Sequence, residues 1–304
     1  MKKFFLPIAL CAAALVSCNK AVDQSAEPVM DLNGAQVVFR MAPETRGATE
    51  VTASTLTSFN VIATSGTESQ SSVWTDGVFS GTSGGNYTGG KYWPSESVTW
   101  NFYASNAAIA FAASGSTITV ADCATDVVAE YIEGATYRAA NALTFDHILC
   151  QLGTVTMKAP ATYTVTGLKV SLLPIYAGTY NMKSDAWTRG DAVAEANRVY
   201  VLGTAAAGVD ISTAGGDITS ADNDLWLLPG SYELKAEYTL NKGDFHKAYV
   251  KNATVSLVQG KNNNLGLPGN NNPNIPDAGD DIADIIFTVS VTPWSNADVP
   301  ANFQ

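Results

Sequence analysis

The sequence predicts an all-β protein, and three observations carry this prediction. Apolar and polar residues alternate along many short runs, most clearly from Tyr232 to Leu240, which is the period of a half-buried strand. Clusters of Gly, Asn, Ser and Thr separate these runs, as turns separate strands. Apolar residues at helical spacing are nearly absent. Such strands bury one face of a sheet and expose the other.

The first residues predict an export signal. Two lysines precede an apolar stretch, residues 4–14, that is too short to span a bilayer. It is followed by Leu15-Val16-Ser17-Cys18, which resembles the lipobox of bacterial lipoproteins, in which the cysteine is lipidated and becomes the first residue. We expect residues 1–17 to be the signal peptide, Cys18 to carry acyl chains and residues 18–35 to be a lipid tether. A plain signal peptide that is cut elsewhere is the alternative.

The mature chain is long and acidic. About 290 of the 304 residues remain after cleavage, which is more than one β-sandwich usually needs, so two domains are expected. The 17 Lys+Arg and 28 Asp+Glu give a net charge of -11, and loss of Lys2 and Lys3 with the signal peptide makes it -13. Because no basic patch is present to bind phosphates, nucleic acid is not expected as a partner.

The folded part is expected to begin near Gln36. A first strand covers Val37 to Met41, and Val98 to Ala104 forms another. Between them, Ser65 to Gly90 is rich in Ser, Thr and Gly and is expected to be a long loop with one short hairpin. Further strands are expected at residues 168–172 and 250–257.

The C-terminal part ends in a strand behind a linker. Residues 260–281 are rich in Asn and Pro and are expected to form the linker. In residues 282–294 the apolar residues that alternate are Ile285, Phe287, Val289 and Val291. A strand at the end of a tether is well placed to pair away from its own sheet.

Two cysteines remain in the folded protein. Cys11 leaves with the signal peptide and Cys18 is lipidated, which leaves Cys123 and Cys150 in a non-cytosolic compartment. A disulfide between them and two buried free thiols are both compatible with the sequence, because the sequence does not give the distance between their Cα atoms.

The sequence contains no recognisable catalytic motif. The two histidines, His147 and His246, lie in no nucleophile elbow and in no zinc-binding HExxH run. His147 and Cys150 have a spacing at which metal ligands can meet, but the apolar surroundings of His147 favour a core histidine bonded to the backbone. The acidic residues 277–284 lack the EF-hand pattern. We expect no enzyme activity, no cofactor and no metal.

Tryptophans permit a second kind of function. Trp74, Trp93, Trp187 and Trp226 could stack on sugar rings, as in a monomeric surface lipoprotein that binds glycans. Tryptophans at strand ends more often fill the core, which is the competing interpretation.

The order of several short motifs indicates a family. Arg46 follows the first strand, and the later motifs are Phe59-Asn60-Val61-Ile62-Ala63, Tyr92-Trp93-Pro94, Leu143-Thr144-Phe145-Asp146-His147-Ile148-Leu149-Cys150-Gln151-Leu152, Gly178-Thr179-Tyr180 and Leu227-Leu228-Pro229-Gly230. Behind a lipobox, this order resembles the fimbrillin family, the type V pilins of Bacteroidales-type bacteria. The chain departs from the family in lacking a glutamine in the Leu-Pro segment and in its long Asn-rich linker.

The resemblance implies an architecture and a location. It implies two transthyretin-like β-sandwich domains in tandem, residues 36–140 and 141–304, without enzyme activity. Fimbrillins travel to the outer membrane as lipoproteins and then form a fimbrium on the cell surface that serves adhesion. The implied partners are other pilin subunits, in a homopolymer or a mixed fimbrium, an arginine-specific protease, and ligands on host or bacterial surfaces.

The resemblance also implies a mechanism of assembly. The protease would cut between Arg46 and Gly47, in a turn-prone segment, and remove the first strand, residues 36–46. The open groove would then be filled by a strand donated by the next subunit, for which the terminal strand is the natural candidate. The alternatives are an ordinary surface arginine and a terminal strand that pairs within its own chain.

Overall fold

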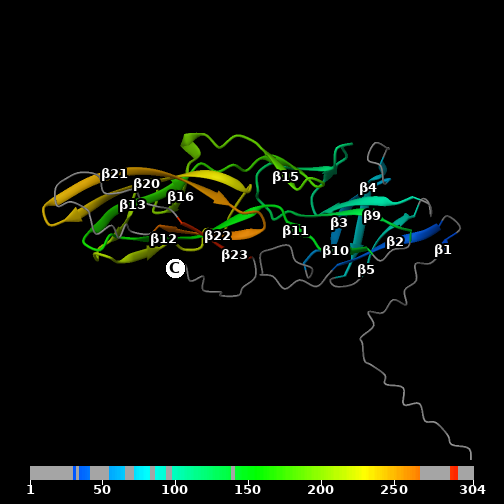
Figure 1. Cartoon of the computed structure of the whole chain (residues 1–304), viewed down its shortest axis with the longest axis horizontal. Helices are drawn as coiled ribbons and strands as arrows, with labels where there is room; N and C mark the ends of the chain where they lie inside the picture. Colours follow the sequence, from blue (N-terminus) through cyan, green and yellow to red (C-terminus); the bar gives the residue numbers. More distant parts are fainter. Residues whose placement is uncertain are drawn as a thin grey trace, which may run out of the picture.

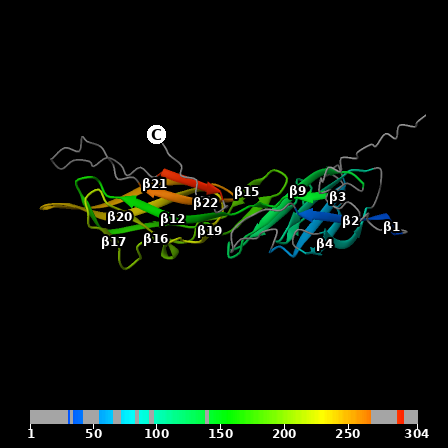
Figure 2. The same cartoon turned by 90° about the horizontal axis from the view of Figure 1, so that it is seen from below.

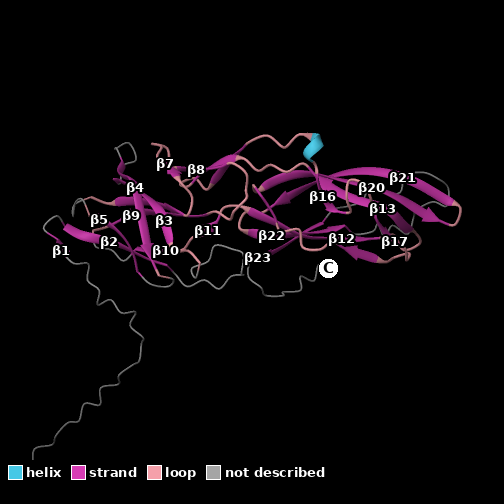
Figure 3. Ribbon diagram, turned by 180° about the vertical axis from the view of Figure 1, so that it is seen from behind, coloured by secondary structure: helices cyan, strands magenta, loops and turns pink. Residues whose placement is uncertain are grey.

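The computed structural model of the chain describes residues 30–31, 34–41, 55–65, 72–82, 86–93, 98–137, 141–267 and 288–293. Strands form almost all of the regular structure in these ranges, and the single helical element among them is a short 3-10 helix, η1 (Glu195–Asn197) (Figure 3). The predicted all-β class is confirmed. The molecule is elongated, with most strands gathered towards its two ends (Figures 1 and 2).

Nine strands from the N-terminal part form one sheet whose two ends are brought together. The order is β1-β2-β5-β4-β3-β6-β9-β11, and β10 pairs with β2. Because β10 and β11 are consecutive in the chain and pair with β2 and β9, residues 141–147 connect the two ends of the sheet. The strands are β1 (Met30–Asp31), β2 (Gly34–Met41), β3 (Ser58–Ser65), β4 (Ser72–Gly81), β5 (Asn86–Tyr92), β6 (Trp100–Ser105), β9 (Val128–Ala135), β10 (Asn141–Leu143) and β11 (Asp146–His147).

The hairpin expected between Ser65 and Gly90 is present, because β4 and β5 pair antiparallel, but the expected long loop is wrong, since these two strands cover most of the segment. Trp74, Phe79 and Tyr87 are buried in the core of this sheet. Glycine serves close packing here, because a Cβ on Gly89 would lie 3.0 Å from the Phe79 ring. The residues that suggested a loop therefore occupy exposed or tightly packed strand positions.

A four-stranded sheet joins segments from both sides of residue 140. Its order is β15-β14-β8-β7, so the hairpin of β14 and β15 pairs with a strand of the N-terminal part. A separate buried core lies here, which includes Tyr103, Ile118, Leu149 and Leu228. The strands are β7 (Ile109–Ala110), β8 (Thr117–Val120), β14 (Gly178–Asn181) and β15 (Ala186–Arg189). The division into two transthyretin-like domains at residue 140 stays a prediction.

The C-terminal part is a sandwich of two five-stranded sheets. One sheet has the order β18-β12-β22-β23 with β19 beside β12, and the other has β16-β13-β20-β21 with β17 beside β13. Both contribute buried side chains to one core, as Leu152 and Leu265 do from the first sheet and Val170 and Leu234 from the second. The strands are β12 (Cys150–Lys158), β13 (Thr164–Leu172), β16 (Val199–Leu202), β17 (Val209–Ile211), β18 (Asp217–Thr219), β19 (Leu225–Leu227), β20 (Gly230–Lys242), β21 (Phe245–Leu257), β22 (Lys261–Leu267) and β23 (Thr288–Pro293).

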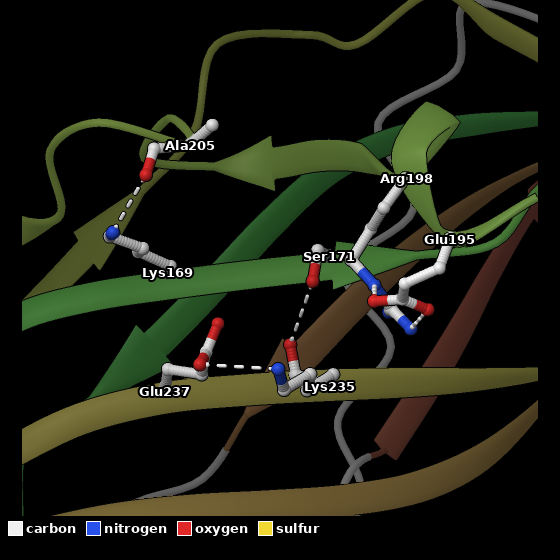
Figure 4. A network of polar contacts seen from close by, with 7 residues as sticks. All are labelled: Lys169, Ser171, Glu195, Arg198, Ala205, Lys235 and Glu237. Atoms are coloured by element: carbon white, nitrogen blue, oxygen red, sulfur yellow. Dashed lines mark hydrogen bonds and ion pairs between the residues drawn. The ribbon is translucent and has the colours of Figure 1, made fainter.

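The outer face of the second sheet is polar. The Lys235 Nζ lies 3.2 Å from the Glu237 Oε1, and Arg198 donates to both carboxylate oxygens of Glu195 at 2.7 and 2.8 Å. Figure 4 shows these contacts. On the opposite face of β20, every second residue from Tyr232 to Leu240 is buried. The alternation that predicted a strand here is confirmed, and these carboxylates form ion pairs on a solvated face.

The expected linker from Gly260 to Asp281 is wrong at its beginning, because residues 261–267 form β22, an internal strand of the sandwich. Asn263 is completely buried, and its Nδ2 donates to the carbonyls of Gln151, Val258 and Lys261 while its Oδ1 accepts from the Val258 N–H. The Oδ1 of Asn264 accepts from the backbone N–H of Thr154, where β12 has a register shift. The side-chain amides of these asparagines bond to backbone groups that a regular ladder would pair with each other, which explains why asparagine occurs within this strand.

Replacing Asn263 with alanine should therefore destabilise the fold. Asn263→Ala leaves several buried backbone groups without a partner, at about 1 to 3 kcal/mol each, so we expect the free energy of unfolding to fall by roughly 2 to 4 kcal/mol. Urea unfolding followed by tryptophan fluorescence measures the change. Asn252→Ala, at an exposed position of β21, is the matched control and should change stability by less than about 0.5 kcal/mol. Equal effects of the two substitutions would contradict this role for Asn263.

Candidate strand-exchange site

β2 is an internal strand with partners along both edges. β5 pairs with it antiparallel, and the register places Tyr87 opposite Phe39. On the other edge β10 pairs with it parallel, with Asn141 opposite Phe39 and Leu143 opposite Met41. β1 pairs antiparallel with the beginning of β2, at Gly34 and Ala35. Loss of β2 would therefore open a slot between two strands that run in opposite directions.

Phe39 lies at the centre of a cluster of aromatic rings. Its ring centroid is 4.8 Å from that of Phe79, 5.2 Å from that of Phe102 and 6.0 Å from that of Phe59, each in an edge-to-face arrangement. Such pairs contribute about 0.5 to 1.5 kcal/mol each beyond the burial of their area. Val37 is the second side chain that β2 places in this core, and both residues are 0% exposed.

The second edge of the slot is fixed by residues 141–147. Leu143 and Phe145 are buried in the same core as Phe39, and the Phe145 ring lies 5.2 Å from the Phe59 ring. The Nδ1 of His147 lies 2.7 Å from the Asp126 Oδ2, and both side chains are buried. This buried contact links β11 to the segment just before β9, the strand with which β11 pairs. The sequence suggested a backbone partner for His147, and no local signal points to Asp126, which is 21 residues away.

Glu130 is a further anchor for this segment. Burial and, to a lesser degree, the nearby Asp146 carboxylate raise the pKa of Glu130 to about 7, although a hydrogen bond from the Thr144 backbone lowers it. The bond to Thr144 joins β9 to the connection between β10 and β11. No sequence pattern marked this carboxylate, because its neighbours come from a different strand.

The predicted terminal strand is present in part and pairs within its own chain. β23 pairs antiparallel with β22, with Val289 opposite Leu265 and Val291 opposite Asn263. It ends the order of its sheet, so β22 is its one partner among the described strands. Of the two sequence-based alternatives, the isolated chain therefore adopts intramolecular pairing. Ile285 and Phe287 lie outside the described residues.

Three predicted processing residues, Cys18, Arg46 and Gly47, also lie outside the described residues. Arg40 is described, and its Nε donates to the Asn86 Oδ1 at 3.1 Å within the ladder of β2 and β5. A protease needs an extended and unpaired segment, so Arg40 is a poor site of cleavage. Within the described part of the chain, no helix has the length and apolar character needed to cross a bilayer.

Cys123 and Cys150 are free, buried thiols and do not form the disulfide that the sequence allowed. The Cys123 Sγ donates to the Tyr176 carbonyl at 3.0 Å and the Cys150 Sγ to the Leu227 carbonyl at 3.3 Å. Burial, with a smaller contribution from Asp122, raises the pKa of Cys123 to about 12, and burial also raises the pKa of Cys150. Both side chains therefore remain thiols and serve packing.

The four tryptophans of the alternative glycan-binding interpretation are packed against the cores, as the competing interpretation has it. Trp74 and Trp93 are buried in the aromatic core of the first sheet. Trp187 and Trp226 are half-buried against the core beside the four-stranded sheet, and the Trp187 Nε1 donates to the Ile148 carbonyl at 3.1 Å. Among the described residues, no group of three His, Cys, Asp or Glu side chains is placed to hold a metal ion.

Comparisons with known proteins give distant matches. No family model matches the chain, and no curated protein does. A solved structure from Bacteroides ovatus, provisionally assigned to cell adhesion, is 12% identical over 84% of this chain and 95% of its own, with a TM-score of 0.40. A protein from Bacteroides eggerthii with the same provisional assignment is 13% identical over 86% of this chain and 97% of its own, with a TM-score of 0.42. One from Parabacteroides distasonis is 8% identical over 86% of this chain and 100% of its own, with a TM-score of 0.40. These assignments describe those proteins and do not transfer at this similarity.

Removing the central ring of the aromatic cluster should weaken the fold strongly. Phe39→Ala leaves a cavity among Phe59, Phe79 and Phe102, and we expect the free energy of unfolding to fall by about 3 to 5 kcal/mol. Thermal and urea unfolding of the full chain measure it. Arg40→Ala, on the other face of the same strand, is the control and should cost less than about 1 kcal/mol. A small effect of Phe39→Ala would show that β2 does not close the core.

Stability should depend on the ionisation of Glu130. Its pKa is raised in the folded state, so folding favours the protonated form; the resulting stability is fully present below about pH 4.5 and is lost as the pH rises through about 7. Glu130→Gln should therefore match the unmodified chain at pH 4 and be more stable at pH 8 in urea unfolding. Glu233→Gln, at an exposed position of β20, is the control. A Glu130→Gln effect that is equal at both pH values would contradict the prediction.

Proposed function

We propose that this chain is a structural pilin subunit that is exported as a lipoprotein on Cys18, cut behind Arg46 and polymerised by strand donation, and that it serves adhesion. The observation that carries the proposal is the place of β2, a buried internal strand that ends five residues before Arg46. Cleavage of one peptide bond in the segment after β2 would allow this strand to leave, and the core would then lack it.

The physical effect of the cut is a change in effective concentration. While β2 is joined to the rest of the chain, it rebinds its slot at once after any opening, because linked segments meet at millimolar effective concentration or higher. After cleavage behind Arg46, β2 is held by its ladders and by two buried side chains, at roughly 1.5 to 3 kcal/mol each. Once it leaves, another strand can take its place.

The other requirement is a strand that can be donated. Among the described strands, β23 pairs along one edge, with β22, whereas β2 pairs along both. An edge strand has fewer ladder bonds to lose, so β23 can leave its sheet more readily than an internal strand can. Insertion into the slot of a neighbour would then pair it along two edges, which favours the polymer over the separate subunits.

This sequence of steps gives the lipid a temporary role. The acyl chains on Cys18 hold the precursor at the outer membrane, and the cut removes them together with β2. The mature subunit is then joined to its neighbours in a fimbrium on the cell surface. The partners are other pilin subunits, an arginine-specific protease and ligands on host or bacterial surfaces.

Blocking the cut should block assembly. Arg46→Ala should abolish high-mass, heat-resistant polymers on denaturing gels of surface extracts, because β2 then stays tethered in its slot. Arg40→Ala removes the other arginine of this region and should leave the polymers unchanged. N-terminal sequencing of the surface protein should begin at Gly47 in the unmodified chain. Polymers that form normally with Arg46→Ala would overturn the cleavage mechanism, and a mature protein that still begins at Cys18 would do the same.

A further inference from the structure

β21 is the longest strand at the edge of a described sheet. It ends the order β16-β13-β20-β21, and all of its 13 residues pair with β20 along one edge. The other strands that end a sheet order have two to six residues, namely β1, β7, β11, β15, β16, β18 and β23. Short edge strands offer few backbone groups to another chain, whereas a long one is a template for pairing. β21 is therefore the edge at which pairing with another copy is the greatest risk.

The side of β21 that faces the core carries two lysines. Directly opposite residues of a ladder lie on the same face of a sheet. In β20, Ala236 and Leu240 are buried in the core of the sandwich. Their partners in β21 are Lys251 and Lys247. Charged side chains thus occupy two positions of the edge strand at which the neighbouring strand has core residues.

The position at the edge allows both lysines to reach water. Lys247 is exposed and Lys251 is half-buried. The Lys247 Nζ lies 5.3 Å from the centroid of the Tyr249 ring, and this ring is stacked on Tyr238 with 5.5 Å between centroids. A lysine at this border can pack its stem on the aromatic ring and keep its ammonium group hydrated, because no described strand lies beyond β21.

A further strand on this edge would remove that hydration. It would lie about 4.8 Å from β21, and its own core-facing side chains would cover the ammonium groups. Burial of a charge without a partner is strongly unfavourable. Pairing between two β21 edges would also bring four lysines onto one face, where like charges repel. The outer face of β21 gives less protection, since Val250 there is apolar and 60% exposed.

We propose that Lys247 and Lys251 keep the free edge of β21 from pairing with a strand of another copy. They protect the one long edge of the described sheets, on the hairpin of β20 and β21 that reaches one end of the molecule (Figures 1 and 2). The inference concerns the uncut chain and holds whether or not strands are exchanged at β2. In a chain that does exchange strands, the same protection directs pairing away from β21.

Removal of the two charges tests the proposal. Lys247→Thr with Lys251→Thr places residues that favour strands at both positions and lowers the net charge of the chain from -11 by two, so general repulsion between copies increases. We nevertheless expect the association constant of the uncut full-length chain to rise by at least about tenfold, because pairing no longer buries charge. Sedimentation velocity over a concentration series measures it, in a mild detergent that separates the acyl chains expected on Cys18.

Hydrogen exchange locates the contact, and two variants serve as controls. The amides of β21 should gain protection with concentration in the double Thr variant and not in the unmodified chain. Lys247→Glu with Lys251→Glu keeps a charge at both positions and should stay monomeric. Lys169→Thr with Lys235→Thr removes the same charge from the outer face of the sheet, where Figure 4 draws both residues, and should also stay monomeric.

Each outcome decides one part of the proposal. A double Thr variant that stays monomeric with a native circular dichroism spectrum overturns it. Association without protection of β21 overturns the assignment to this edge, and equal association of the double Glu variant overturns the electrostatic cause. If the double Thr variant does not fold, Lys247→Thr and Lys251→Thr are measured singly, and monomers in both count against the proposal. Polymers formed after cleavage report on the proposed function separately.

Discussion

The N-terminal sheet depends on β2, which completes the hydrogen-bonded ladders between β5 and β10 and also fills the aromatic core. Its two edges pair with strands of opposite direction, and its inner face supplies Val37 and Phe39 to the aromatic cluster. The contacts of Phe59, Phe79 and Phe102 converge on Phe39, so the arrangement of the first core depends on a segment near the chain terminus. Unpaired ladder groups and an open apolar core are both unfavourable in water, so a chain without β2 would expose both, as the proposed strand exchange requires.

The segment after this sheet links the slot to the rest of the molecule. Residues 141–147 pair with β2 and β9, and β12 of the sandwich begins three residues later. The hairpin of β14 and β15 returns from the C-terminal part to pair with β8, over a core of its own. Asp126 and His147 form their pair at this junction. The geometry of the slot is thus held by contacts from both halves of the chain.

Period-two alternation was enough to predict the all-β class and the faces of β2 and β20, because burial on one side of a sheet leaves a local pattern. The pattern failed where polar or small residues serve a distant partner. Asn263 of β22 donates to three backbone carbonyls, and Gly89 of β5 makes room for Phe79, so both segments resemble loops in the sequence. The parallel pairing of β10, the partner of His147 and the environment of Glu130 join residues far apart in the chain. No local rule gives such contacts.

One consequence of the orientation of β2 is mechanical. The strand runs along the long axis of the molecule in both side views (Figures 1 and 2). In the proposed polymer, tension along this axis would therefore load all the hydrogen bonds of an inserted strand in shear, at the same moment, instead of breaking them one by one. A short strand loaded in shear resists far more force than the same strand unzipped from one end. In the proposed fibre, this orientation of β2 would favour resistance to tension along the fibre axis.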